Sequence, residues 1–232
     1  MHLSRVRVDL NGLSRNELFA VMGGEPYGTH QLLWRLFPDY TGLRPFLFRQ
    51  EIEDGADGEG RCKGLPLFYL LSEQTPVAIP GFLDVESKPF APRLDAGETL
   101  AFRLRANPTV ARRVDGQKHS VRSDVLMHAK AAFAPDQRAS QECKDAMDAA
   151  ARQWLAGQGE KNGFVLEEQP EVSGYRQHSL GRKRQGKPIQ FSGVDYTGTL
   201  EVIDAQAFMA SLAQGLGRSK AFGFGMMMIR RA

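Results

Sequence analysis

The stretch Gly215-Leu216-Gly217-Arg218-Ser219-Lys220-Ala221-Phe222-Gly223-Phe224-Gly225 lies between a predicted helix and the predicted last strand of this chain. The helix follows Asp204, a typical N-cap residue, and places Phe208, Leu212 and Leu216 on one face. The strand, predicted over 222–230, is apolar on both faces, as in a central strand. A dinucleotide-binding loop needs the opposite order of elements, and the GxxxxGK[ST] pattern of a P-loop is absent.

Two interpretations of this glycine-rich stretch remain open from its spacing. It is either a turn whose backbone amides and basic side chains bind a phosphate of a polymer, or a tight turn in which a glycine caps the helix. In both interpretations the chain ends in the order strand, helix, strand. The fold class therefore depends on which elements come before.

The first half of the chain begins with a strand and two helices. Alternating apolar and polar residues predict a strand over 1–10, and extended segments are predicted over 44–52, 66–73 and 81–90. One helix is predicted from the N-cap Ser14, with Glu17 three residues on, to Gly23-Gly24. A second is predicted over 27–37, between Pro26 and Pro38. The link over 75–81 is too short for a long helix.

The second half repeats this order of elements. A strand begins near Glu98, helices over 123–133 and 140–156 have the N-caps Ser123 and Ser140, and strands follow over 163–169, 172–179, 187–193 and 195–203. Helical spacing places Cys143 in the core, together with Met147, Ala150 and Trp154. The order predicts an α+β protein of two tandem ferredoxin-like (βαββαβ) units, with domains over 1–93 and 97–232.

Composition places the chain among ordinary globular proteins. Its 232 residues are 42% hydrophobic and 25% charged, with a formal net charge of +3. The two cysteines exclude a disulfide scaffold, and no apolar run approaches the about 18 residues of a membrane span. The first residues lack the apolar core of a signal peptide. We expect a cytoplasmic protein that has no membrane partner and is a monomer when free.

Basic residues are concentrated in particular stretches. The ranges 172–194 and 205–232 contain no acid, and a third basic range spans 103–118. Such sorting presents a local positive field to a polyanion, although each range alone is also typical of a solvated surface. The acidic range 51–60 is typical of a solvated loop. The candidate polyanion-binding residues are Arg112, Arg113, Lys118, Arg182, Lys183, Arg184, Lys187, Arg218 and Lys220.

The helix predicted over 27–37 carries a tyrosine–histidine pair. His30 lies one helical turn after Tyr27, so both side chains share a face near the helix N-terminus. The positive end of the helix favours a bound phosphate, and histidine transfers protons near neutral pH. The alternative is a surface histidine packed by Tyr27. The histidines and cysteines show no metal-ligand spacing, so we expect neither a metal site nor a cofactor.

The motif Tyr27-x-x-His30-x-Leu32-Leu33-Trp34-x-Leu36-Phe37, taken with the glycine-rich stretch, resembles the CasE family of CRISPR repeat endoribonucleases from type I-E Cascade systems. Arg105-Ala106-Asn107-Pro108-Thr109 and the range 154–164 are also similar to that family. The resemblance implies two ferredoxin-like domains and metal-independent cleavage of a repeat stem-loop RNA at the 3′ base of the hairpin. It places the family's active-site histidine and tyrosine on His30 and Tyr27.

The resemblance also implies how the RNA is held and cut. A basic hairpin with Arg182, Lys183 and Arg184 enters the RNA major groove near the end of the stem. Attack by the 2′-hydroxyl leaves a 2′,3′-cyclic phosphate and a 5′-hydroxyl. The sequence does not decide whether His30 acts as acid or base, or whether Lys220 or Lys118 stabilises the charge.

The implied partners are the repeat RNA, the mature crRNA that stays bound, and the other Cascade subunits. Two other classes of protein remain as alternatives. One is a non-catalytic subunit that only binds guide RNA, and the other is a small-molecule enzyme with a closed apolar pocket beside His30.

Overall fold

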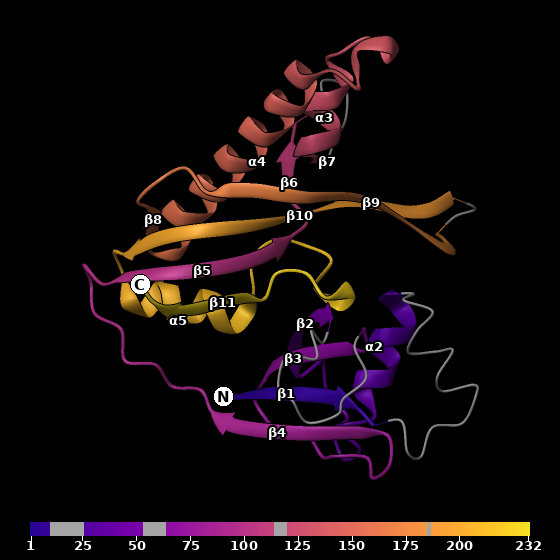
Figure 1. Ribbon diagram of the computed structural model, residues 1–232, viewed down its shortest axis with the longest axis vertical. Coiled ribbons are helices and arrows are strands. Elements are labelled where there is room, and N and C mark those ends of the chain that lie inside the picture. The colour runs from indigo at the N-terminus through magenta and orange to yellow at the C-terminus, as the bar shows by residue number, and fades with distance from the viewer. Residues whose placement is uncertain (10–25, 53–63, 114–119, 185–186) are drawn as a thin grey trace. The chain divides into compact units, whose positions relative to one another are not determined.

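The computed structural model describes residues 1–9, 26–52, 64–113, 120–184 and 187–232. They form two compact units, drawn in Figure 1. The first unit contains Met1–Arg93 together with Lys220–Met226, and the second contains Leu94–Ser219 together with Met227–Ala232. The chain therefore returns to the first unit near its C-terminal end, through the second half of the glycine-rich stretch.

The first unit is an antiparallel sheet covered by one described helix. Its elements are β1 (His2–Val8), α2 (Pro26–Trp34), β2 (Phe46–Ile52), β3 (Pro66–Ser72) and β4 (Leu83–Pro89). The strands lie in the order β2-β3-β1-β4. No helix separates β3 from β4, as the short link predicted, so this ferredoxin-like unit lacks a regular second helix.

The core of the first unit lies between one face of this sheet and α2 with the turn that follows it. Leu33 and Leu36 are fully buried and pack against Phe46 and Phe48 of β2. Phe37 stacks on Phe46, with ring centroids 5.2 Å apart and planes 9° apart. Burying such large apolar side chains is the main favourable contribution to folding, so α2 is held firmly on the sheet.

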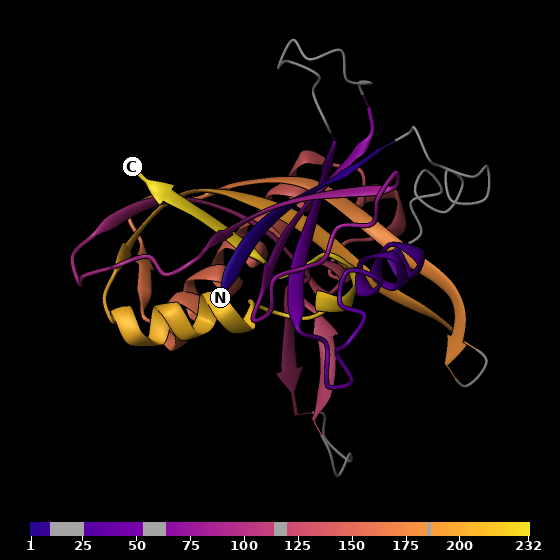
Figure 2. The ribbon, with the colours of Figure 1, turned by 90° about the horizontal axis from the view of Figure 1, so that it is seen from below.

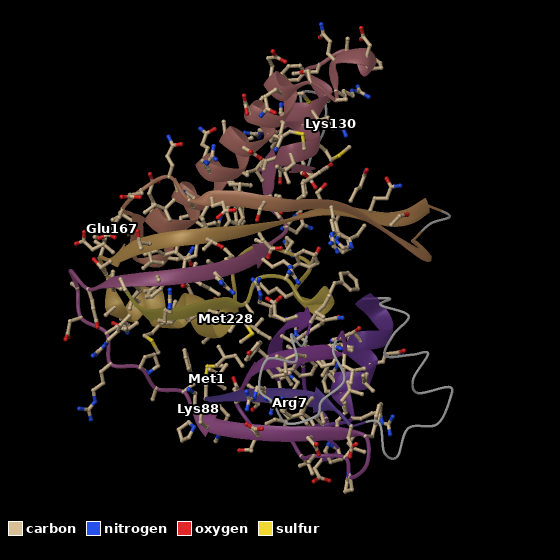
Figure 3. The ribbon with its side chains drawn as sticks, in the orientation of Figure 1. Met1, Arg7, Lys88, Lys130, Glu167 and Met228 are labelled. Atoms are coloured by element: carbon tan, nitrogen blue, oxygen red, sulfur yellow. The ribbon has the colours of Figure 1, made fainter. Side chains whose placement is uncertain are left out.

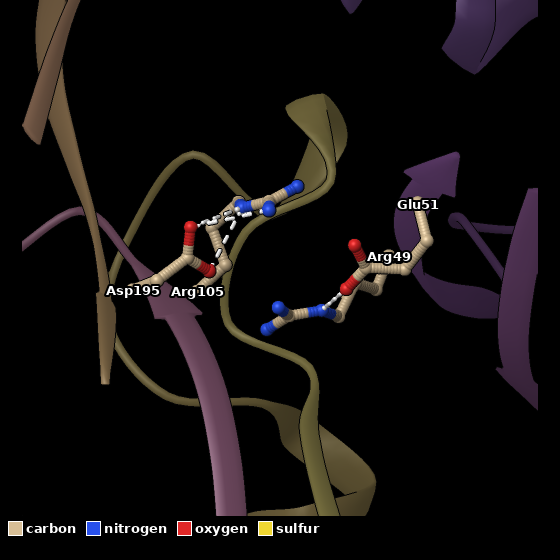
Figure 4. Close-up of polar contacts among 4 residues, drawn as sticks. All are labelled: Arg49, Glu51, Arg105 and Asp195. Carbon is tan, nitrogen blue, oxygen red and sulfur yellow. Dashed lines mark hydrogen bonds and ion pairs between the residues drawn. The ribbon is translucent and has the colours of Figure 1, made fainter. Parts of the chain in front are cut away.

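The opposite face of the same sheet is partly apolar and partly ionic. Leu47 and Leu71 form a small buried cluster with Met226, which arrives from the end of the chain. Arg49 pairs with Glu51 on β2 (Figure 4). Arg7, labelled on β1 in Figure 3, bonds to Glu86 over 2.6 Å. Met226 therefore covers apolar surface that would otherwise be exposed on this face.

The second unit is a larger α+β unit. Its elements are β5 (Thr99–Ala106), β6 (Thr109–Arg112), β7 (Val121–Asp124), α3 (Val125–Ala131), a 3-10 turn η1 (Pro135–Gln137), α4 (Gln141–Asn162), β8 (Phe164–Leu166), β9 (Glu171–Arg184), β10 (Lys187–Val202), α5 (Ala205–Gln214) and β11 (Met227–Arg231). The main sheet has the order β11-β5-β10-β8, and β9 also pairs with β10. Figure 2 shows α5 on one side of this sheet.

Aromatic side chains form the centre of the second unit. Tyr196 of β10 is fully buried, stacks on Trp154 of α4 at 6.1 Å, and donates its hydroxyl hydrogen to the carbonyl of Ala151 over 3.1 Å. Phe164 and Phe208 meet edge to face at 5.5 Å. These contacts attach α4 and α5 to the sheet. Lys130 of α3, labelled in Figure 3, lies over the ring of Tyr175.

Several sequence predictions for this unit are confirmed. Ser140 caps α4, since its hydroxyl oxygen accepts the N–H of Cys143, and the helix ends at Gly163 in the left-handed conformation. Cys143, Met147 and Trp154 are buried as expected, with Ala151 rather than Ala150 as the buried alanine. Asp204 caps α5 through the N–H of Ala207. The helix predicted from Ser14 to Gly24 lies outside the described residues.

Other predictions were wrong. The cap of α3 is Asp124, because Ser123 is paired in β7 with Val110. The strands predicted over 187–193 and 195–203 are one strand, β10, with a register shift between Gly193 and Asp195. The hairpin of β6 and β7 was not predicted.

The last strand also differs from its prediction. It begins at Met227 rather than 222 and ends the described strand order instead of lying in its middle. No helix in the described parts of the chain is long and apolar enough to cross a membrane.

Candidate active site and nucleic-acid interface

The glycine-rich stretch begins in the second unit as a tightly packed turn. Gly215 caps α5, and its N–H bonds to the carbonyl of Ser211. Gly217 has a φ of +74°, and a Cβ added there would lie 3.1 Å from the carbonyl oxygen of Asn107 and from Trp154. Asn107 also donates from Nδ2 to the Ser219 hydroxyl over 2.7 Å. Only glycine fits this approach without strain, so the turn is fixed by packing.

The second half of the stretch lies in the first unit. Residues Lys220–Phe222 form a 3-10 turn, η2, that packs against both α2 and β2. Gly223 has a φ of +83°, and a Cβ there would come within 3.0 Å of Phe48. The turn thus sits directly on the aromatic side chains of β2. This packing brings Lys220 next to the helix that carries His30.

His30 is half-buried in an aromatic surrounding. Its Nε2 accepts a hydrogen bond from the indole N–H of Trp34, one turn further along α2, over 3.2 Å. Its ring lies 5.9 Å from the ring of Phe46. Burial lowers the pKa of His30 below its ordinary value, and repulsion from the Arg44 guanidinium lowers it further. The imidazole is therefore neutral more readily than a solvated histidine.

Arg44 and Lys220 provide positive charge at the same place. Arg44 lies just before β2 and is half-buried, and burial lowers the pKa of its guanidinium. Burial and repulsion from Arg44 also lower the pKa of Lys220. Arg44 therefore lies close to both His30 and Lys220 in the first unit. The sequence analysis did not identify Arg44 as a candidate residue, because an arginine just before a strand belongs to no motif that would distinguish it.

Four of the predicted basic residues of the second unit lie on a projecting hairpin. Residues 187–193 of β10 pair only with β9 within the described sheet, whereas β5 joins from Val194 onward. β9 and β10 therefore extend past their neighbours, as Figure 1 shows. Arg182, Lys183 and Arg184 are at the end of β9, and Lys187 begins β10 opposite Arg184. Their side chains lie outside what the structure describes.

The base of this hairpin carries further cationic groups on one face of the sheet. Arg105 binds Asp195 across the strands, with Nε 3.1 Å from Oδ1 and Nη2 3.1 Å from Oδ2 (Figure 4). His178 stacks on Phe191 with ring centroids 5.0 Å apart. Burial lowers the pKa of His178, and Arg176 and Arg105 add to the effect. Sequence analysis missed this group because its members are far apart in the chain.

The remaining predicted residues are placed as follows. Tyr27 lies in α2 one turn before His30, but its side chain is not described. Arg112 ends β6, and Arg113 and Arg218 are exposed. The backbone of Arg218 bridges to Asn107. Lys118 lies outside the described residues. Within the described ranges, no three His, Cys, Asp or Glu side chains are grouped to hold a metal ion.

Comparison with known proteins agrees with this architecture. A model of the CRISPR associated protein family matches residues 1–231. This match places the fold and the glycine-rich stretch in the class of CRISPR-associated proteins.

Individual relatives identify the family within the class of CRISPR-associated proteins. The chain is 31% identical over 202 residues to the Cascade subunit CasE of Escherichia coli K12, covering 87% of this chain and 89% of that one. It is 27% identical over 211 residues to the endoribonuclease Cse3 of Thermus thermophilus, covering 87% and 81%. The structure of Cse3 bound to a 19-nucleotide RNA matches with a TM-score of 0.69 and 26% identity over 99% of this chain and 100% of that one. The chain belongs to the CasE family of CRISPR-associated proteins.

Proposed function

We propose that this endoribonuclease cleaves a CRISPR repeat stem-loop RNA at the 3′ base of the hairpin, with the RNA's own 2′-hydroxyl as nucleophile and without a metal ion. The observation that carries the proposal is the position of His30, which is half-buried on α2 with Arg44 and Lys220 close by. Structures of the relative Cse3 with RNA, one of them a pre-cleavage complex, support an RNA substrate.

The reaction needs only proton transfer and charge stabilisation. The 2′-oxygen forms a bond to phosphorus and loses its proton, while the bond from phosphorus to the 5′-oxygen breaks and that oxygen gains a proton. The products are a 2′,3′-cyclic phosphate and a 5′-hydroxyl. Holding the reacting atoms in line supplies much of the acceleration, and general acid–base catalysis contributes about 10²–10⁴-fold.

His30 is the proton-transferring group in this proposal. A neutral ring can accept the proton of the 2′-hydroxyl, and a protonated ring can supply one to the leaving 5′-oxygen. The lowered pKa favours the neutral ring in the free protein. The negative charge of a bound phosphodiester would compensate the positive charges of Arg44 and Lys220. It would thereby stabilise the protonated ring and raise the pKa of His30 towards neutrality. Tyr27 orients the ribose or holds the phosphate.

The second unit binds the RNA stem in this proposal. Arg182, Lys183, Arg184 and Lys187 on the β9–β10 hairpin contact the stem, mostly through phosphates, because the major groove of A-form RNA is too narrow to read. Arg112, Arg113, Lys118 and Arg218 add to the positive surface. The mature crRNA stays bound after cleavage, and the complex joins the other Cascade subunits, in line with the naming of the E. coli relative.

The test is cleavage of repeat RNA by the wild type and by His30→Ala. The wild type is incubated in EDTA with a panel of type I-E repeat stem-loop RNAs, and the product ends are mapped. We expect one cut per repeat, a 2′,3′-cyclic phosphate, and no cleavage by His30→Ala, which should keep nearly the full affinity for the hairpin. Cleavage by His30→Ala at the wild-type rate would reject the role of His30. Binding without any cleavage by the wild type would favour the non-catalytic alternative.

A further inference from the structure

Arg44 occupies an unusual position for an arginine. It lies between α2 and β2, directly before Pro45. A residue before proline is restricted to extended backbone, which limits where the side chain can go. The Nε atom of Arg44 is buried and has no hydrogen-bond partner among the described residues. A guanidinium has no form without charge in proteins, so a buried donor of this kind is costly unless something binds it.

The surroundings of Arg44 point to an anion. Three elements meet there, since η2 packs against both α2 and β2, and they bring the cations Arg44 and Lys220 beside His30. Arg44 is half-buried, and burial lowers the pKa of its guanidinium, so the charge is costly where it stands. Like charges gathered in a half-buried place repel one another, and an anion relieves that repulsion. Aromatic rings of Trp34 and Phe46 beside His30 reduce the water that would screen the charges.

We propose that Arg44 binds the scissile phosphate, with its guanidinium and the Lys220 ammonium contacting the non-bridging oxygens on which negative charge grows during cleavage. This inference rests on the proposed function and adds a residue to it. A planar guanidinium suits a phosphate because two of its N–H groups can bond two oxygens at once. Fixed donors of this kind act most strongly on the transition state, where the charge is greatest.

Arg44 and the hairpin arginines are expected to affect different measured quantities, the cleavage rate and the RNA affinity. The hairpin contacts are made equally before and during the reaction, so removing them weakens binding. Arg44 acts where charge develops, so its removal should lower the rate at saturating enzyme more than the affinity. A residue that merely supported the fold would change stability instead.

The experiment compares Arg44→Gln and Arg44→Lys with Arg35→Gln. Arg35 follows α2, is exposed, and lies over the ring of Phe82, so its variant removes the same charge from the same unit. Cleavage is measured under single-turnover conditions with a repeat RNA that the wild type cuts. Affinity is measured with the same RNA carrying a 2′-deoxy nucleotide at the cleavage site. We expect Arg44→Gln to lower the rate about 10²–10³-fold, Arg44→Lys to restore part of it, and Arg35→Gln to leave it unchanged.

A sulfur substitution at the scissile phosphate distinguishes contact from structure. Replacing one non-bridging oxygen slows the wild type, and we expect this effect to shrink in Arg44→Gln, because that variant no longer makes the interaction that sulfur weakens. Equal rates for Arg44→Gln and Arg35→Gln, or an equal sulfur effect in Arg44→Gln and wild type, would overturn the proposal. The result for His30→Ala is independent: an active His30→Ala rejects the proposed function, whereas an inactive one with an active Arg44→Gln rejects only the role of Arg44.

Discussion

The indole N–H of Trp34 donates to Nε2 of His30 within α2, over 3.2 Å. An indole nitrogen only donates, so His30 must accept at Nε2 and carry its proton on Nδ1 while it is neutral. Protonating Nε2 requires that this bond be given up. Trp34 therefore opposes the charged ring, in the same direction as burial and as the charge of Arg44.

Trp34→Phe is expected to raise the pKa of His30. The variant removes the donor to the neutral ring but keeps an aromatic side chain beside Phe46, whose ring lies 5.8 Å from that of Trp34. The pKa and the tautomer of His30 are measured by NMR titration of the imidazole in the free protein. Tyr40→Phe is the matched control, since Tyr40 also lies beside Trp34 and leaves the bond intact. An unchanged pKa with the same Nδ1–H tautomer would contradict the prediction.

Acid should destabilise the fold through two histidines. The pKa values of His30 and His178 are both lowered from 6.5 in the folded chain, by burial first and then by arginine charge. The unfolded chain therefore binds more protons, and the stability that these groups contribute is lost as pH falls below their ordinary pKa.

Urea unfolding at about pH 7.5 and about pH 5.5 measures this loss. We expect His178→Gln to lose less stability over this range than the wild type, because Arg176, Arg105 and Phe191 no longer surround a titrating ring. His128→Gln is the control, since His128 is exposed on α3. Identical slopes for His178→Gln and the wild type would show that His178 titrates alike in both states.

Asp124→Ala should cost more stability than the loss of an ordinary helix cap. Its Oδ1 accepts the N–H groups of Leu126 and Met127 at the start of α3, and its Oδ2 accepts the N–H of Ser192 on β10 over 3.0 Å. We expect a loss of about 2–3 kcal/mol, against about 1 kcal/mol for Ser140→Ala, which removes the cap bond to Cys143 and an exposed bond to Glu142 but no bond to another element. Urea denaturation measures both. Equal losses would mean that the bond to Ser192 contributes nothing.

Removing charge from the hairpin should weaken RNA binding and flatten its dependence on salt. The triple variant Arg182→Ala, Lys183→Ala, Arg184→Ala is compared with Arg138→Ala, Lys144→Ala, Lys161→Ala, three exposed bases elsewhere in the second unit. Removing each phosphate contact should reduce the slope of log affinity against log salt by about 0.7–0.9. Affinity for the uncleaved 2′-deoxy RNA is measured over a salt series. Equal slopes in both triple variants would show that the RNA stem does not bind to the β9–β10 hairpin.

The sequence predicted the strands and the helices with clear caps, because their signals are local. It predicted Ser123 as the cap of α3, where Asp124 is the cap, since both side chains suit the position and only the pairing of β7 decides. Gly193 resembled a break between strands but accommodates a register shift inside β10. The range 222–226 resembled the start of a strand because it is apolar. Its apolar side chains instead serve the first unit, where Met226 packs on Leu47 and Leu71.

The sequence also indicated only some residues of the candidate site, for a similar reason. His30 was recognisable because it shares a helix with Tyr27, and Lys220 because it lies in the glycine-rich stretch. Arg44 was not, since its significance depends on its neighbours in space. Nothing in the spacing of the chain indicates that η2 rests on α2 and β2.

The return of Lys220–Met226 to the first unit has a consequence for synthesis of the protein. As the ribosome makes the chain, β1 to β4 emerge long before the segment that supplies Lys220 and covers Leu47. The candidate site around His30 is therefore incomplete until Lys220–Met226 has been translated. A polypeptide that ends before Lys220 would carry His30 without this lysine, so under the proposed function we expect it not to process RNA.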